Sequence, residues 1–179
     1  IISKSKNILK DYLSGKSEYE PDIISTVISI NAYNGDSSLF QDYVNYMNNA
    51  KTPQDEVRFQ RSLSLFKGDK EIEKLFNLIL DNKIRSQDSP YLLASTLNNE
   101  AVGWKTWKFI EKNWEDLTKR FPENSIVRML SGIRSLNKRD YLNHLKAFFD
   151  EGDKIKQGRL QLDQHLEKLE INVNFRESL

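Results

Sequence analysis

The most constraining feature of the sequence is a helical stripe between Val102 and Phe121, a stretch that holds all three tryptophans of the protein. At about 100° per residue, one helical face carries large apolar side chains and the opposite face carries lysines. The apolar face is Trp107, Ile110, Trp114, Leu117 and Phe121, and the basic face is Lys105, Lys108, Lys112 and Lys119. This pattern predicts one long amphipathic helix that ends before Pro122. Because truncating a buried tryptophan costs roughly 3–5 kcal/mol, we expect Trp107 and Trp114 to be central to the core.

The rest of the chain repeats the same helical spacing of apolar residues, and no useful stretch alternates with a period of two. Prolines, glycines and capping residues mark the helix ends, with Ser37, Thr52 and Asn124 or Ser125 expected as N-caps. A capping box is also expected at residues 137–140. The predicted helices run from about 2, 21, 37, 53, 69, 90, 102, 124, 139 and 158. The fold class is therefore all-α, with ten or eleven helices.

Pairs of predicted helices begin near residues 21, 53, 90, 124 and 157. This regular interval is typical of stacked αα-hairpins, in which each unit buries its apolar face against its neighbours. The prediction is an αα-hairpin superhelix, a curved and right-handed HEAT/armadillo-like solenoid, and a compact irregular bundle is the alternative. We expect residues 1–17 to be an N-terminal helix left from a truncated repeat, and residues 18–179 to form the helical repeat domain.

Charge and composition exclude several classes of protein. The 27 basic residues nearly cancel the 26 acidic ones, which argues against nucleic acid or an anionic membrane as a partner. The longest apolar run, residues 75–80, is too short to span a bilayer. Without cysteine the chain cannot form disulfides or a thiolate zinc site, and it has no Asn-x-Ser/Thr acceptor. We expect a cytoplasmic location, and because Ile1 is not an initiator methionine we expect a longer parent chain.

The sequence offers no catalytic or metal-ligating constellation. Its two histidines, His144 and His165, belong to no His-Glu-x-x-His motif, and both lie among apolar neighbours, which favours packed or partly buried side chains. The glycines follow helices instead of forming a phosphate loop, and no serine has the context of a nucleophile. We therefore predict no catalytic residue, no metal ligand and no cofactor in this chain, which alone should be inactive.

Basic residues are the remaining candidates for a binding site. Lys105, Lys108 and Lys112 form a stripe that is able to attract an acidic group, such as the carboxylate at the C-terminus of a peptide. The alternative is a solvated helix face, in which interleaved acidic residues pair with these lysines. Arg85 lies at a predicted helix junction, where a guanidinium bonds terminal carbonyls or the nearby Asp88. For Arg85 a structural role is favoured over peptide binding.

Four segments carry a resemblance to one family, at residues 84–88, 107–117, 146–149 and 166–173. The specific part is the Trp-x-Phe-x-x-x-Asn-Trp pattern that begins at Trp107 and ends at Trp114. In their order and spacing, the four segments resemble the C-terminal helical domain of one family of zinc metallo-aminopeptidases. The family includes aminopeptidase N, the puromycin-sensitive enzyme and the tricorn-interacting factors. The resemblance covers roughly residues 18 to 175.

The resemblance implies a HEAT-like domain that encloses the active-site chamber and helps to bind peptide substrates. It also implies that zinc belongs to the parent enzyme, in a catalytic domain of the same polypeptide, so that no catalytic residue is carried over. The chain departs from the family pattern at Thr106, at residues 172–175 and at Asn98, where an arginine in some members holds a peptide C-terminus. A free-standing HEAT-like protein-interaction module is the alternative function.

Overall fold

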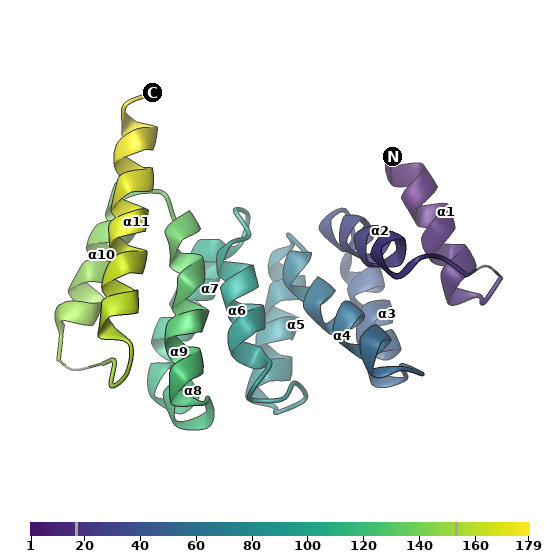
Figure 1. Cartoon of the computed structure of the whole chain (residues 1–179), viewed down its shortest axis with the longest axis horizontal. Helices are drawn as coiled ribbons and strands as arrows, with labels where there is room; N and C mark the ends of the chain where they lie inside the picture. The colour runs from purple at the N-terminus through teal and green to yellow at the C-terminus, as the bar shows by residue number, and fades with distance from the viewer. Residues whose placement is uncertain (17, 153) are drawn as a thin grey trace. The chain divides into compact units, whose positions relative to one another are not determined.

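The computed structural model describes residues 1–16, 18–152 and 154–179, and within them every regular element is helical (Figure 1). The elements are α1 (Ile2–Leu13), α2 (Pro21–Tyr33), α3 (Ser37–Asn48), α4 (Pro53–Ser62), η1 (Leu63–Leu65), α5 (Asp69–Leu80), α6 (Ser89–Leu97), α7 (Gly103–Lys112), α8 (Trp114–Arg120), α9 (Glu123–Leu130), η2 (Ser131–Ser135), α10 (Arg139–Asp150) and α11 (Arg159–Glu177). The η elements are 3₁₀ turns that continue the preceding helix. The predicted all-α class is confirmed, and the succession of helical hairpins is that of an α-solenoid-like domain.

The chain forms two compact units, Ile1–Leu75 and Phe76–Leu179. In the first unit, α1 packs against α2 and α3 packs against α4. The fully buried side chains of this unit include Ile28, Phe40, Tyr43 and Phe66. The Phe66 ring meets the rings of Phe40 and Tyr43 edge to face. The expected boundary between residues 17 and 18 stays a prediction, and residue 17 itself lies outside the described residues.

Two hydrogen-bonded caps fix the start of α3 and α4. Thr52 caps α4 as predicted, because its Oγ1 accepts a hydrogen bond of 3.2 Å from the amide of Asp55. The prediction for α3 was wrong by one residue: Asp36, and not Ser37, is the N-cap. The Asp36 carboxylate accepts from the amides of Ser38 and Leu39 at 3.1 and 3.0 Å. Its extended backbone places the carboxylate over the first turn, while Ser37 is already helical.

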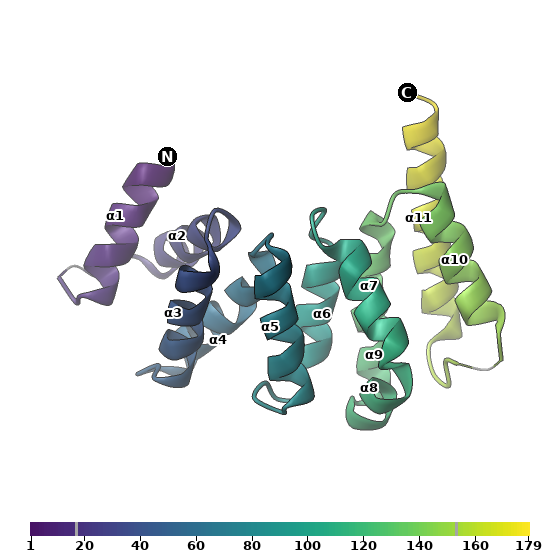
Figure 2. The same ribbon diagram turned by 180° about the vertical axis from the view of Figure 1, so that it is seen from behind.

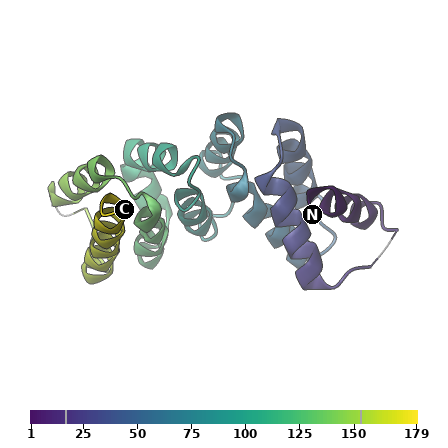
Figure 3. The ribbon, with the colours of Figure 1, turned by 90° about the horizontal axis from the view of Figure 1, so that it is seen from above.

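In the second unit, α6 packs against α7 and against α9 with η2, and α11 packs against η2, α9 and α10. Figure 2 shows α7 and α10 on the face opposite to the one on which α6, α9 and α11 appear in Figure 1. Figure 3 shows α10 and α11 side by side. Gly132 allows η2 to lie close to α6, because a Cβ at this position would lie 2.3 Å from the carbonyl oxygen of Ala94. The predicted hairpin starts agree with the observed helices within two residues, since α6, α9 and α11 begin at Ser89, Glu123 and Arg159.

The predicted helix over residues 102–121 is wrong as a single element, because it divides at Asn113 into α7 and α8. The Asn113 side chain donates from Nδ2 to the carbonyl oxygen of Phe109 at 2.8 Å, and its backbone leaves the helical region. An asparagine that bonds its own helix in this way competes with helix continuation. The apolar stripe survives the break, since Ile110, Leu117 and Phe121 are all buried.

Two further predicted caps were wrong. Neither Asn124 nor Ser125 caps α9, which begins at Glu123 directly after Pro122. The expected capping box at residues 137–140 is also absent, because Lys138 holds the N-cap position of α10 without a side-chain hydrogen bond. In both cases the helix begins one or two residues away from the polar residue expected as its cap. That side chain is therefore not at the N-cap position, from which it would reach the free amides of the first turn.

Candidate functional site

Helix α7 carries three of the four basic residues predicted as peptide-binding candidates. Lys105 is half-buried, whereas Lys108 and Lys112 are exposed. The ammonium group of Lys108 forms an ion pair with the carboxylate of Glu111, one turn further along α7. This pairing is the i,i+3 arrangement expected of a solvated helix face, and it compensates part of the positive charge of the stripe.

Glu111 connects α7 to α10 through His144. The carboxylate oxygen Oε1 accepts a hydrogen bond of 2.7 Å from Nε2 of His144, while Oε2 accepts from Lys108. Partial burial raises the pKa of Glu111, but the hydrogen bonds from Lys108 and His144 outweigh burial, so the pKa lies below its ordinary value. Glu111 is therefore ionised at neutral pH and holds two donors, which suits a structural bridge better than a proton-transfer group.

A stacked aromatic pair lies beside this bridge. The rings of Trp104 and Tyr141 are parallel within 3°, with centroids 3.8 Å apart, and His144 meets Trp104 edge to face at 5.3 Å. The Nζ atoms of Lys138 and Lys108 lie 5.2 and 6.0 Å from the Tyr141 and Trp104 centroids. Each such cation–π contact contributes about 0.5–1 kcal/mol at an exposed site. We call Trp104, Lys108, Lys138, Tyr141 and His144 the aromatic–basic patch.

Trp107 and Trp114 belong to a second aromatic cluster beneath this surface. Trp107 is fully buried and meets Phe148 at 5.2 Å and Phe149 at 5.6 Å between ring centroids. Trp114 is half-buried and contacts the same two rings at 5.4 and 5.8 Å. The indole Nε1 of Trp107 has no hydrogen-bond acceptor among the described residues. The cluster joins α7 and α8 to α10 through packing alone.

Arg85, the fourth basic candidate, is exposed in the segment between α5 and α6. Its carbonyl oxygen accepts from the amides of Asp88 and Ser89 at 2.9 and 3.0 Å, and from Oγ of Ser89 at 3.0 Å. The backbone of Arg85 therefore organises the turn that leads into α6. Four hollows among the described residues, one in the first unit and three in the second, are lined by other side chains. Arg85, Lys105, Lys108 and Lys112 therefore stay predictions as peptide-binding groups.

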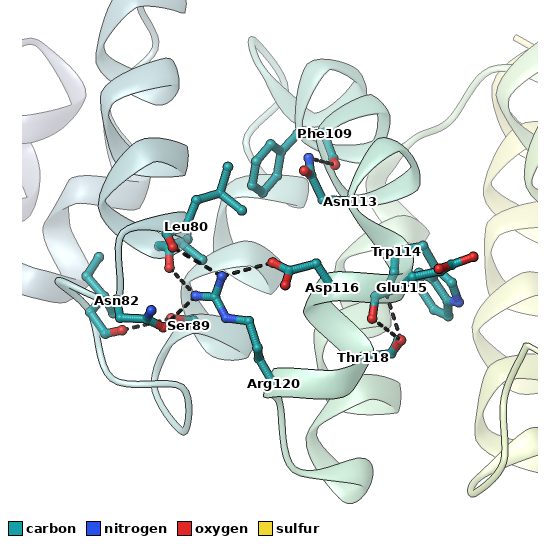
Figure 4. Close-up of polar contacts among 12 residues, drawn as sticks. Leu80, Asn82, Ser89, Phe109, Asn113, Trp114, Glu115, Asp116, Thr118 and Arg120 are labelled. Atoms are coloured by element: carbon teal, nitrogen blue, oxygen red, sulfur yellow. Dashed lines mark hydrogen bonds and ion pairs between the residues drawn. The ribbon is translucent and has the colours of Figure 1, made fainter.

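Sequence reasoning missed Arg120, whose guanidinium binds the end of α5 (Figure 4). Nη2 donates to the carbonyl oxygen of Ile79 at 2.6 Å and to Oδ1 of Asn82 at 2.7 Å. Nη1 donates to the carbonyl oxygen of Leu80 at 3.2 Å and to Oδ2 of Asp116 at 2.9 Å. A basic residue in the last turn of α8 was visible in the sequence, but nothing in the sequence identified its partners 38 to 41 residues away.

The described residues do not offer a fit for zinc. They contain no group of three or more His, Cys, Asp or Glu side chains placed to hold a metal ion. His144 is bonded to Glu111 on α10 and α7, whereas the half-buried His165 lies on α11. Zinc sites need three or four converging ligands. No step of zinc chemistry is derived from this part of the chain.

No helix among the described residues is long and apolar enough to cross a membrane. Helical hairpins with buried aromatic clusters make this an all-helical, α-solenoid-like domain. Comparison with known proteins gives the family: the model of the ERAP1-like C-terminal domain matches residues 1–171, and the chain belongs to this family.

The relatives in this family are named as aminopeptidases. The chain is 29% identical over 157 residues to endoplasmic reticulum aminopeptidase 2 of Bos taurus, a match covering 83% of this chain and 16% of that protein. It is 26% identical over 151 residues to mitochondrial aminopeptidase 2 of Saccharomyces cerevisiae, covering 78% of this chain and 15% of that protein. It is 30% identical over 101 residues to human endoplasmic reticulum aminopeptidase 1, covering 52% of this chain and 10% of that protein. The chain thus spans about a sixth of the first two relatives. The predicted resemblance to the C-terminal domain of aminopeptidases is confirmed.

Proposed function

We propose that this chain is the C-terminal, non-catalytic domain of a zinc-dependent metallo-aminopeptidase, a hydrolase. The observation that carries the proposal is the family match over residues 1–171, to a domain that takes up only a sixth of the aminopeptidases it resembles. The remaining five-sixths of such an enzyme is long enough to form a separate catalytic domain. The zinc ligands and the catalytic groups are assigned to that domain, because the described residues here supply no metal cluster.

The domain's role in this proposal is to enclose the active-site chamber and to help bind the peptide substrate. The proposal gives the domain two partners: the catalytic domain of the same polypeptide, and the peptide substrates. It assigns no role to nucleic acid or to a membrane. The aromatic–basic patch supports this role, because stacked rings and flanking lysines suit a peptide's side chains and carboxylates. The HEAT-like architecture and a cytoplasmic location belong to the same proposal, although the relatives include proteins named for the endoplasmic reticulum and the mitochondrion.

The deciding experiment is to sequence the reading frame upstream of the codon for Ile1 and to assay its full product. The expected result is a His-Glu-x-x-His motif with a further downstream Glu, and chelator-sensitive release of amino-terminal residues from peptides. A nearby start codon or an unrelated upstream domain would overturn the proposal. In that case the free-standing HEAT-like interaction module becomes the better assignment.

A further inference from the structure

A groove with unbalanced positive charge runs along one face of α11 in the second unit. His165, Lys168 and Asn172 follow one another at helical spacing on this face. Two hollows lie along it. One is lined by Asn98, Arg134, Ser135, Lys168, Ile171 and Asn172. The other is lined by residues of α6, α9 and the start of α11, among them Tyr91, Val127, Arg128 and His165. We call Arg128, Arg134, His165 and Lys168, with the two hollows, the basic groove.

The cations of the basic groove have no acidic partner among the residues that the structure describes. Among the described residues that line the two hollows, none is Asp or Glu. Arg128 donates from Nη1 to the neutral hydroxyl of Tyr91 at 2.8 Å, and Arg134 donates from Nε to the carbonyl oxygen of Ser131 at 2.8 Å. Elsewhere on the same unit, exposed cations such as Lys146 and Arg159 do have carboxylate partners. The groove therefore differs from the ordinary solvated face of this protein.

The groove is also held in place before any ligand arrives. Arg134 is half-buried, its Nε donates to the carbonyl oxygen of Ser131, and it lines one hollow together with Lys168. Asn172 donates from Nδ2 to the carbonyl oxygen of Arg134 at 2.9 Å, which ties η2 to α11. A guanidinium anchored in this way loses little side-chain freedom on binding an anion.

The electrostatics of His165 agree with this geometry. Burial lowers the pKa of His165, and the positive charges of Arg134 and Lys168 lower it further, against an opposing hydrogen bond to the backbone of Val127. A neighbouring carboxylate would have the opposite effect on this imidazole. Three basic groups from η2 and α11 thus share one region, and no described residue that lines its two hollows is acidic.

We propose that the basic groove binds the acidic side chains of a peptide. A planar guanidinium that is anchored through Nε, together with a nearby ammonium, suits carboxylates. The lining also includes Ala94, Val127, Ile171 and the half-exposed Tyr91, which offer apolar contact that a bare inorganic anion would not use. Two adjacent hollows suit an extended chain with more than one contact point. The inference rests on the proposed function for the nature of the ligand, and it deepens that function by naming the preferred substrate class.

The test is direct binding of labelled nine-residue peptides to the 179-residue chain, measured by fluorescence anisotropy at low salt. One peptide carries two central glutamates and the other carries glutamines at the same positions, and both have amidated C-termini so that only side-chain carboxylates differ. We expect the glutamate peptide to bind at least tenfold more tightly, and its advantage to fall as salt is added. Equal affinities for the two peptides would overturn the proposal.

Variants assign the preference to the groove. The double variant Lys168→Gln with Arg134→Gln should reduce the preference for the glutamate peptide to less than twofold. The single variant Lys168→Glu should have the same effect, and because Lys168 is exposed this substitution should not disturb folding. The matched control, Lys83→Gln with Lys119→Gln, removes two exposed charges from the same unit and should keep the preference. An equal loss in the control would overturn the assignment to the groove. Displacement of the peptide by inorganic phosphate at micromolar concentration would overturn the peptide as its ligand, because it would indicate a simple anion site. Since no catalysis is measured, these results are independent of whether a zinc-binding catalytic domain lies upstream.

Discussion

The guanidinium of Arg120 donates a hydrogen bond of 2.6 Å to the backbone carbonyl oxygen of Ile79, in the last turn of α5. The last carbonyl groups of a helix have no partner within that helix, and a cation near them also interacts favourably with the helix dipole. Arg120 donates hydrogen bonds to two of these carbonyl oxygens, those of Ile79 and Leu80. It also donates to the side chain of Asn82, whose backbone has a positive φ of 55° where the chain leaves the helix. One side chain of α8 thus stabilises both the end of α5 and the turn after it.

Replacing Arg120 by methionine should therefore destabilise the protein by about 1–3 kcal/mol, the usual range for losing hydrogen bonds to a charged group. Arg120→Lys should give an intermediate loss, because an ammonium cannot span the same set of acceptors. The measurement is urea unfolding followed by circular dichroism. The neighbouring Lys119→Met is the control, because Lys119 is exposed and forms only a long 3.9 Å ion pair. Similar losses for Arg120→Met and Lys119→Met would show that the bonds to α5 contribute little.

Trp107 and Trp114 should respond differently to substitution, although they share ring contacts. Trp107→Ala should cost about 3–5 kcal/mol because the side chain is fully buried. Trp107→Phe should cost only about 1–2 kcal/mol, since the indole Nε1 has no hydrogen-bond acceptor among the residues that the structure describes. Trp114→Ala should lower the thermal midpoint by several degrees, but by less than Trp107→Ala, because Trp114 is half-buried. Thermal unfolding of the three variants gives the order, and a larger effect for Trp114 would contradict the packing described here.

Much of the fold was predictable because apolar spacing and helix-ending residues are local signals. The starts of α2, α4 and α5 follow directly from Pro21, Pro53 and Asp69. The break at Asn113 and the cap at Asp36 were missed for a local reason. Whether an asparagine bonds its own helix, or which of two adjacent polar residues caps it, depends on backbone angles that composition does not determine.

The site was less predictable because its contacts join residues far apart in the chain. Glu111 is one of the acidic residues interleaved with the lysine stripe, so the sequence indicates only a local partner for it. Its bond to His144, 33 residues later, depends on how α7 meets α10. The groove cations Arg134 and Lys168 come from different hairpins and have no local motif. Family resemblance, in contrast, was visible from the Trp-x-Phe-x-x-x-Asn-Trp pattern, because the spacing of these residues can be read directly from the sequence.

Tyr12 should give the first unit a measurable pH dependence in alkaline solution. Its hydroxyl donates to Oδ1 of Asp55 at 2.6 Å, and burial together with this bond raises the pKa of Tyr12 from 10.0 to about 12. Since the folded-state pKa is above the unfolded value, the stabilisation is fully present below pH 10 and is lost as the pH rises through about 12. Tyr12→Phe should cost about 0.5–1.5 kcal/mol near pH 8, and the difference from the wild type should shrink towards zero by pH 12. Urea midpoints across this range test it, with the exposed Tyr33→Phe as a control; a difference that stays constant with pH would exclude the Tyr12–Asp55 bond as its cause.

Lys105 and Lys108 test the peptide-binding role in the complete enzyme. If α7 contacts the distal part of a bound peptide, Lys105→Ala with Lys108→Ala should raise KM for long peptides by about three- to tenfold, the scale of one or two partly exposed ionic contacts. KM for single-residue chromogenic substrates should not change, since these do not reach beyond the catalytic domain. Glu111→Gln is the matched control, because it breaks the ion pair with Lys108 while leaving both lysines in place, and it should not raise KM for either substrate. Equal effects of the double lysine variant on long and short substrates would mean that it acts through folding or domain contacts, and the lysine face would then be an ordinary solvated surface.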